Sequence, residues 1–239
     1  MLPPCLSMLQ PMTSSRFFAV LLISGCATGT MPVPESPRGV LTAGFVALES
    51  VYNSELMAPY DVLQHSIFRD SLNYIALFVV TPTGAPFIMF EGITIVPHYS
   101  FANAPPIDIL VVPSTGRSMN DDLADEVFMS WLYETTQHAR FVITVCDGAF
   151  LLAATGLLDG RVATTFPADR YRLAEMFPEV NVLYDARLAI DGKFTTSVGR
   201  ALSYEPALYL VEALYGTEHA RRTTGARLGP GTRSTRLAP

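Results

Sequence analysis

Short, almost wholly apolar segments alternate along the chain with segments of helical periodicity, and this alternation constrains the fold most. Three of the apolar segments are NYIALFVV (73–80), IDILVVP (107–113) and ARFVITVC (139–146). Strands that are apolar on both faces are typical of a parallel sheet covered by helices on each side. The alternation therefore predicts a three-layer α/β/α sandwich with a mainly parallel sheet. Ligands of such folds bind beyond the carboxyl ends of the strands.

Composition supports a folded core and excludes several classes of function. Of the 239 residues, 49% are hydrophobic and 16% are charged, and the net charge is -6. An acidic chain without a basic stripe is not expected to bind nucleic acid. No apolar run reaches the roughly 18 residues of a membrane-spanning helix. No spacing suggests a metal cage or a glycine-rich phosphate loop, so we expect no metal and no cofactor.

Residues 1–26 have the features of an export signal. The stretch RFFAVLLISGCATG has one Arg, an apolar segment and then ISGC ending at Cys26, an order that resembles a bacterial lipobox. Lipid on Cys26 would anchor the protein to a membrane without spanning it, so we expect an extracytoplasmic or periplasmic lipoprotein of the bacterial cell envelope. The alternatives are a plain signal peptide and a misassigned start, which would leave the protein in the cytoplasm.

The rest of the chain divides into a linker, one domain and a tail. Residues 27–42 are Pro-rich and are predicted to be a tether, 43–228 the folded domain, and 229–239 a disordered tail. Cys5 would leave with the signal and Cys26 would carry lipid, so Cys146 has no partner for an internal disulfide.

Several local signals predict where helices begin and where hairpins turn. Ser54 is expected to cap one helix, and Asn120 with Asp121 a longer one that ends near Gln137. Turns are expected at 91–92 and at 191–192, the second joining two antiparallel strands.

Cys146, in the stretch TVCDGAF (144–150), lies where an apolar strand turns into a helix. The unpaired N–H groups and positive potential of a helix N-terminus favour the thiolate. Gly148 lets the turn close, as in the nucleophile elbow G-x-S-x-G, but Thr144 replaces the first glycine of that pattern. A buried structural cysteine is the alternative explanation.

Several collinear segments resemble the ThiJ/PfpI superfamily, in a layout nearest to its isonitrile hydratase-like members. These segments are SELMAPYDVL (54–63), IVPHYSFANAPPIDILVVPSTG (95–116), VCDGAFLLAATGLLDGRVATT (145–165) and TTSVGRALSYEPALYLVEALYG (195–216). The resemblance covers roughly Gly44 to Leu228 and implies a flavodoxin-like, class I glutamine-amidotransferase-like fold. It also implies a homodimer and a small-molecule substrate.

The resemblance assigns roles to particular residues. Cys146 would be the reactive thiol, and Glu55, four residues before a proline, the acid that points at it. A protonated carboxyl that donates a hydrogen bond to sulfur stabilises the thiolate and can also transfer a proton. The backbone N–H groups of Asp147 and Gly148, and of the turn at Thr115 and Gly116, would be oxyanion donors. The implied reaction is isonitrile hydration, or a glyoxalase- or deglycase-type addition to an aldehyde.

The chain departs from the superfamily pattern at two positions. Phe166 stands where many relatives have His, which argues against peptidase activity. Asp147 replaces a residue that usually carries a hydroxyl group, and the simplest interpretation is that it caps the following helix. Glu55 also has a simpler interpretation, since an acid in the first turn stabilises a helix. A non-catalytic ligand-binding or redox-sensing domain of the same fold therefore remains the alternative.

Overall fold

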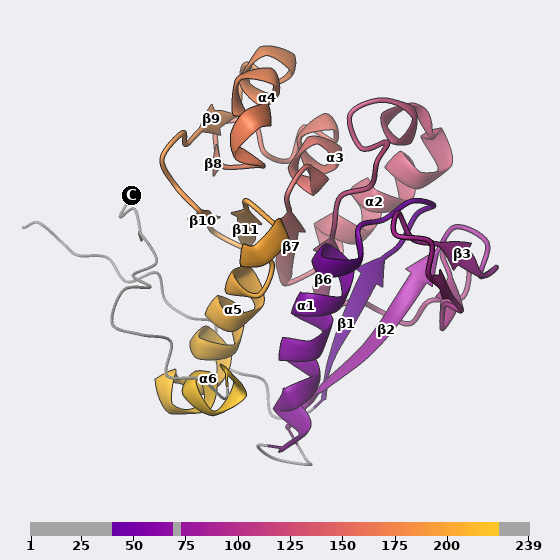
Figure 1. Ribbon diagram of the computed structural model, residues 1–239, viewed down its shortest axis with the longest axis vertical. Coiled ribbons are helices and arrows are strands. Elements are labelled where there is room, and N and C mark those ends of the chain that lie inside the picture. Colours follow the sequence, from indigo (N-terminus) through magenta and orange to yellow (C-terminus); the bar gives the residue numbers. More distant parts are fainter. Residues whose placement is uncertain (1–39, 69–72, 225–239) are drawn as a thin grey trace, which may run out of the picture.

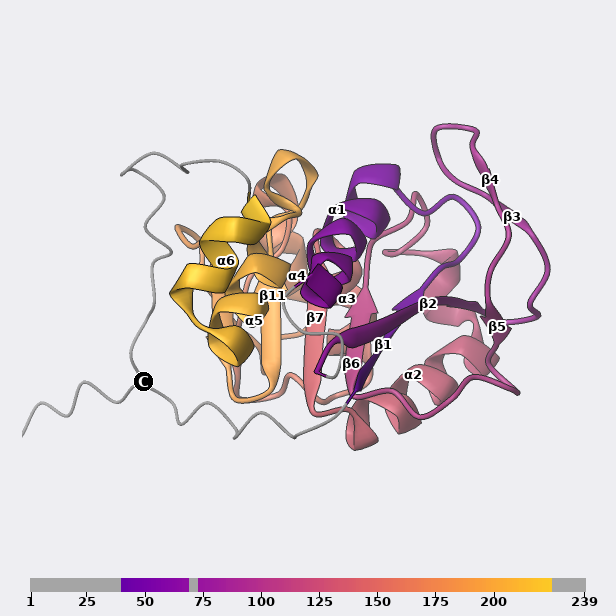
Figure 2. The same ribbon diagram turned by 90° about the horizontal axis from the view of Figure 1, so that it is seen from below.

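The computed structural model describes residues 40–68 and 73–224, which form a central sheet with helices on both faces (Figures 1 and 2). The predicted three-layer α/β/α sandwich is confirmed. The expected leader (1–26), its Cys26 and the expected tail (229–239) lie outside the described residues. The first strand begins at Leu41, so it includes the last two residues of the expected linker (27–42).

The main sheet has seven strands in the order β10-β11-β7-β6-β1-β2-β5. Its pairs are parallel except that between β10 and β11, which forms the predicted hairpin around Gly192. Two further two-stranded sheets pair β3 with β4 and β8 with β9. The strands are β1 (Leu41–Val46), β2 (Ile75–Thr81), β3 (Phe87–Ile88), β4 (Thr94–Ile95), β5 (Tyr99–Ser100), β6 (Ile109–Val112), β7 (Phe141–Val145), β8 (Val162–Ala163), β9 (Asn181–Val182), β10 (Leu188–Asp191) and β11 (Phe194–Ser197).

Two apolar cores join the helices to opposite faces of the sheet. One core packs α1 and α5 against the sheet around Phe45 and Leu56, and the other packs α2 and α3 around Phe128 and Phe150. Within the described residues, no helix is long and apolar enough to cross a membrane. The helices are α1 (Asn53–Gln64), α2 (Glu126–His138), α3 (Gly148–Ala154), α4 (Arg170–Met176), α5 (Glu205–Tyr215) and α6 (Thr217–Thr224), with short 3-10 turns η1 (His65–Phe68), η2 (Asp121–Ala124), η3 (Pro167–Asp169) and η4 (Arg200–Leu202).

The strand order places a topological switch point beside β1. From β1 the chain passes through α1 to β2 on one side, and it later returns to β6 on the other side of β1. In open α/β sheets, ligands bind at such a point, outside the carboxyl ends of the strands. The segments that follow β1, β6 and β7 therefore meet at the edge of the sheet where a site is expected.

Two expected helix caps are wrong. Ser54 does not cap α1, whose N-cap residue is Tyr52 and has no capping side-chain hydrogen bond. The long helix expected from residue 120 is divided into η2 and α2, and α2 is capped by Asp125, whose carboxylate accepts a hydrogen bond from the Phe128 N–H at 3.0 Å. Several acidic residues precede α2, so sequence spacing alone did not distinguish the one that caps it.

Candidate active site

Cys146 forms the turn between β7 and α3 with a backbone conformation that few side chains adopt. Its φ is 55°, in the left-handed region, and its N–H donates a hydrogen bond to the Ser197 carbonyl at 2.9 Å. A non-glycine residue in this region costs about 1–3 kcal/mol and persists only when its surroundings impose it. The strained strand-to-helix turn of a nucleophile elbow is therefore present, although only half of its sequence pattern is.

Two glycines make this turn fit between its neighbours. A Cβ on Gly148 would lie 2.2 Å from the Val112 carbonyl oxygen, so α3 can begin this close to the end of β6 only with glycine there. A Cβ on Gly199 would lie 2.5 Å from the Cys146 Cβ. The absence of a side chain at both positions lets the Cys146 turn lie close against the ends of β6 and β11.

Glu55 is buried in α1 and faces the cysteine. Its side chain is 2% exposed, and its carboxyl accepts hydrogen bonds from the Ser114 N–H at 3.1 Å and from the Ser114 hydroxyl at 2.5 Å. The Cys146 thiol lies close enough to this carboxyl for each group to shift the pKa of the other. A helix-dipole role would leave the carboxylate in water, so this arrangement favours the interpretation in which Glu55 acts with Cys146.

Ser114 is a site residue that sequence reasoning missed. It follows β6, and its side chain is fully buried between the carboxyl of Glu55 and the thiol of Cys146. Serine in a loop is common, so its type gave no signal. Its position directly after an apolar strand, at the predicted ligand-binding edge, was the available indication.

Burial raises the pKa of Glu55 to about 7. The hydrogen bonds from Ser114 and Cys146 act in the opposite direction, because they stabilise the carboxylate, but burial is the larger effect. A carboxyl group with a pKa near neutrality can both donate and accept a proton in one reaction cycle.

Burial also raises the pKa of the Cys146 thiol, and negative charge on Glu55 and then on Asp147 raises it further. The Ser114 hydroxyl acts in the opposite direction. The expectation that the helix N-terminus yields a resting thiolate is therefore wrong in direction, since the side chain is only 3% exposed. A thiol of this kind becomes a nucleophile when a nearby base takes its proton.

Asp147 occupies the N-cap position of α3, but its side chain makes no capping hydrogen bond, so the simplest interpretation of this residue is wrong. Its carboxylate instead accepts a hydrogen bond from the Thr165 hydroxyl at 2.8 Å, and no side-chain capping bond is present. Burial raises its pKa to about 6, while the bond from Thr165 opposes that shift. Two carboxyl groups, Glu55 and Asp147, therefore flank Cys146.

The expected oxyanion donors differ in availability. The Thr115 N–H already donates to the Ser118 hydroxyl at 2.8 Å, and the Gly116 N–H donates to the Ser50 carbonyl at 3.1 Å. Both are committed within the protein, so they are not free donors in this structure. The N–H groups of Asp147 and Gly148 donate to no acceptor among the described residues, which leaves these two as the candidates.

Aromatic and cationic side chains surround the Cys146 turn. Phe166 stands where many relatives have a histidine, and its ring lies under the guanidinium of Arg200. The distance from the Arg200 Cζ to the ring centroid is 4.6 Å. Tyr52 packs on Phe90 with ring centroids 4.6 Å apart. Burial raises the pKa of the Tyr52 hydroxyl, and the negative charge of Glu55 raises it further, whereas the Arg200 guanidinium lowers it.

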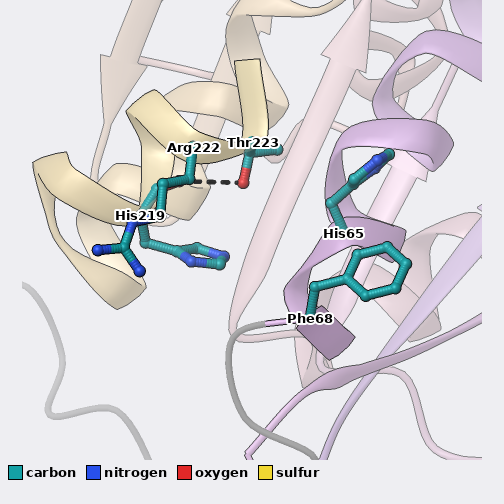
Figure 3. A pocket seen from close by; sticks show the side chains of 5 residues that line it. All are labelled: His65, Phe68, His219, Arg222 and Thr223. Carbon is teal, nitrogen blue, oxygen red and sulfur yellow. Dashed lines mark hydrogen bonds between the residues drawn. The ribbon is translucent and has the colours of Figure 1, made fainter. Parts of the chain in front are cut away.

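A separate pocket of about 240 Å³ lies between η1 and α6 (Figure 3). His65 and Phe68 line one side, and His219, Arg222 and Thr223 line the other. None of the residues around Cys146 lines it, so pocket and thiol are distinct places on the molecule. Among the described residues, no group of three His, Cys, Asp or Glu side chains could hold a metal ion.

Comparison with known proteins decides the family. The profile of the DJ-1/PfpI family matches residues 42–213. The chain belongs to the DJ-1/PfpI family. Isonitrile hydratase from Pseudomonas putida is 28% identical over 182 residues, which are 76% of this chain and 75% of that protein. The HTH-type transcriptional regulator GbdR from Pseudomonas aeruginosa is 24% identical over 194 residues; the match covers 81% of this chain but only 51% of the regulator.

Solved structures confirm the fold. A ThiJ/PfpI family protein from Pseudomonas syringae superposes with a TM-score of 0.68 at 21% identity, covering 92% of this chain and 90% of that one. Drosophila melanogaster DJ-1beta superposes with a TM-score of 0.67 at 21% identity, covering 78% of this chain and 96% of that one. The DJ-1/PfpI family thus includes relatives named as an enzyme and as transcriptional regulators.

Proposed function

We propose that this protein is a cysteine-dependent enzyme that acts on small electrophilic molecules. One observation carries the proposal: Glu55, buried and held by Ser114, is coupled to a Cys146 that occupies a strained elbow. The strained backbone of Cys146 and the buried carboxyl of Glu55 both lower the stability of the folded protein. Such features are typical of sites that perform chemistry. The similarity to isonitrile hydratase supports the same class of reaction.

For an isonitrile, the site supports a hydration in two stages. Glu55 accepts the thiol proton as the Cys146 sulfur bonds to the terminal carbon, and it then returns that proton to the same carbon, giving a thioimidate. Water adds to this carbon, the carbon–sulfur bond breaks, and sulfur recovers a proton. The net change is addition of one water molecule, which yields an N-substituted formamide.

An aldehyde is the competing substrate class. Addition of sulfur to an aldehyde carbon places negative charge on oxygen, which the N–H groups of Asp147 and Gly148 would stabilise. Glu55 would then protonate that oxygen or move a proton between adjacent carbons, as a glyoxalase- or deglycase-type reaction requires. Peptidase activity is not proposed, because Phe166 cannot serve as the base that a histidine would be.

A screen over isonitriles and α-oxoaldehydes tests the proposal. Product formation by the wild type is compared with that of Cys146→Ser and Glu55→Gln, and Glu134→Gln, an exposed acid in α2, is the matched control. We expect the control to match the wild type and both site variants to lose at least about a hundredfold in rate. Turnover that survives in Cys146→Ser would contradict a cysteine mechanism.

A non-catalytic sensing role is the second candidate, and the similarity to GbdR supports it. In that case Cys146 would bind or be oxidised without turnover, and Asp147 and Glu55 would control its reactivity. A stable sulfenate at Cys146 after peroxide treatment, with no product from any electrophile, would favour this candidate over the enzyme.

We also propose a homodimer that is tethered to the cell envelope through lipid on Cys26. Exposed apolar side chains on and beside the β3–β4 hairpin support an interface between two copies, since monomers rarely leave such patches uncovered. These side chains are Ile88, Phe90, Ile93 and Val96. With a net charge of -6, nucleic acid is not proposed as a partner.

A further inference from the structure

Arg200 is a cation beside the thiol that no salt bridge within the described residues neutralises. It follows Gly199, whose missing Cβ leaves the space that the Cys146 Cβ occupies. Its side chain is exposed, so nothing in the core requires an arginine at this position. Its backbone adjoins Gly199, which lies against Cys146, and its guanidinium lies over Phe166, so the cation belongs to the same part of the molecule as the thiol. Its charge also acts on the Asp147 carboxyl and on the Tyr52 hydroxyl.

Two features hold the guanidinium at this place. Arg200 has a φ of 53°, a left-handed conformation that a side chain of its type rarely adopts. The guanidinium lies over the Phe166 ring at 4.6 Å, which fixes its direction, and stacking through its face leaves the in-plane N–H groups available for hydrogen bonds. A strained backbone together with an aromatic support indicates a positioned group rather than a solvated surface charge.

The neighbouring acid does not use this cation. The Asp147 carboxylate already accepts a hydrogen bond from the Thr165 hydroxyl at 2.8 Å. The Glu55 carboxyl is held by the N–H and the hydroxyl of Ser114. Arg200 makes no ion pair with an acid of the described residues, and its fork of N–H donors matches a carboxylate supplied from outside.

We infer that Arg200 binds an anionic substituent, a carboxylate above all, of the molecule whose electrophilic carbon Cys146 attacks. This inference rests on the proposed function and names its substrate class: small electrophiles that carry a carboxylate close to the reacting carbon. Arg200 would orient that carbon toward sulfur, and Tyr52, among the same charges, would lie beside the bound anion.

Two alkylating reagents test the inference without requiring turnover. Iodoacetate and iodoacetamide present the same electrophilic carbon, but only iodoacetate carries a carboxylate. The measured quantity is the alkylation rate of Cys146 with iodoacetate divided by its rate with iodoacetamide, both followed by mass spectrometry. This ratio reports charge recognition, because a change in thiol reactivity affects both rates equally and cancels. We expect this ratio to fall by about fivefold or more in Arg200→Gln, as for loss of one charged hydrogen-bonded pair. Arg200→Lys should give an intermediate value.

Arg140→Gln is the matched control. Arg140 also lies over an aromatic ring, that of Phe141 at 5.6 Å, but it precedes β7 whereas Cys146 follows it. Arg140→Gln removes one positive charge, as Arg200→Gln does, but it should leave the ratio unchanged. Three results would overturn the inference. The ratio could be equal in the wild type and Arg200→Gln, it could fall as much in the control as in Arg200→Gln, or neither reagent could alkylate Cys146.

The outcomes also separate this inference from the proposed function. If the ratio depends on Arg200 but no electrophile is turned over, the anion site stands and the enzyme proposal fails. If neutral isonitriles or aldehydes are turned over while the ratio is independent of Arg200, the enzyme stands and the anion site fails. For an active enzyme, an isonitrile with a carboxylate should lose kcat/KM in Arg200→Gln about as much as the alkylation ratio falls, whereas its methyl ester should lose less.

Discussion

Replacing Glu55 with Gln should change how the stability of the protein depends on pH. Burial raises the pKa of this carboxyl from 4.5 to about 7, so the folded protein holds the proton more tightly than the unfolded chain. The stabilisation is complete below the ordinary pKa and is lost as the pH rises toward the folded value. A shift of this size corresponds to about 2 to 3 kcal/mol of unfolding free energy lost between roughly pH 5 and pH 8.

Urea denaturation at these two pH values measures the effect. The unfolding free energy of the wild type should fall more steeply from the lower to the higher pH than that of Glu55→Gln, by about 2 to 3 kcal/mol. Asp147 titrates in both proteins, so its contribution cancels in the comparison. Glu134→Gln should retain the wild-type dependence. If wild type and Glu55→Gln lose the same free energy, Glu55 is not a buried acid with a raised pKa.

Three further predictions concern the turn, the second acid and the anchor. Gly148→Ala should lower the unfolding free energy by at least about 2 kcal/mol in a denaturation experiment, because its Cβ would meet the Val112 carbonyl oxygen; an unchanged midpoint would refute the packing. Thr165→Val should raise the pKa of Asp147 above about 6, because that hydroxyl stabilises the carboxylate; carboxyl titration by NMR measures this pKa, and a value that falls would contradict the assignment. Cys26→Ala should move the protein, expressed in a bacterium, from the detergent to the aqueous phase on Triton X-114 partitioning; detergent partitioning that persists would exclude lipid on Cys26.

The layers of the fold could be predicted from sequence, because the spacing of apolar residues and the length of each apolar segment indicate which faces of a strand or helix are buried. The segments 107–113 and 139–146 are apolar on both faces, and both contain central parallel strands. Helix starts were predicted less well. Ser54 and the acids before α2 all have types that cap helices, and only the local backbone decides which of them does so.

The candidate site was predictable in its residues but not in its electrostatics. Cys146 and Glu55 follow from an elbow and from a family resemblance, and the structure brings them together. The exposure of the thiol depends on residues far away in sequence, such as Ser114 and Gly199, whose packing no local pattern encodes. The pKa of the thiol, raised by burial rather than lowered by the helix, therefore had to come from the structure.

The most direct test of the account is the pH dependence of Cys146 alkylation by iodoacetamide in wild type and in Glu55→Gln. Negative charge on Glu55 raises the pKa of the thiol, and Glu55 acquires that charge above about pH 7. Because the thiol stays protonated, its alkylation needs the Glu55 carboxylate to accept the proton. The account therefore predicts that the two profiles diverge above that pH, with the wild type alkylated faster than the variant. Profiles that coincide across the whole range would contradict the claim that Glu55 and Cys146 form one site.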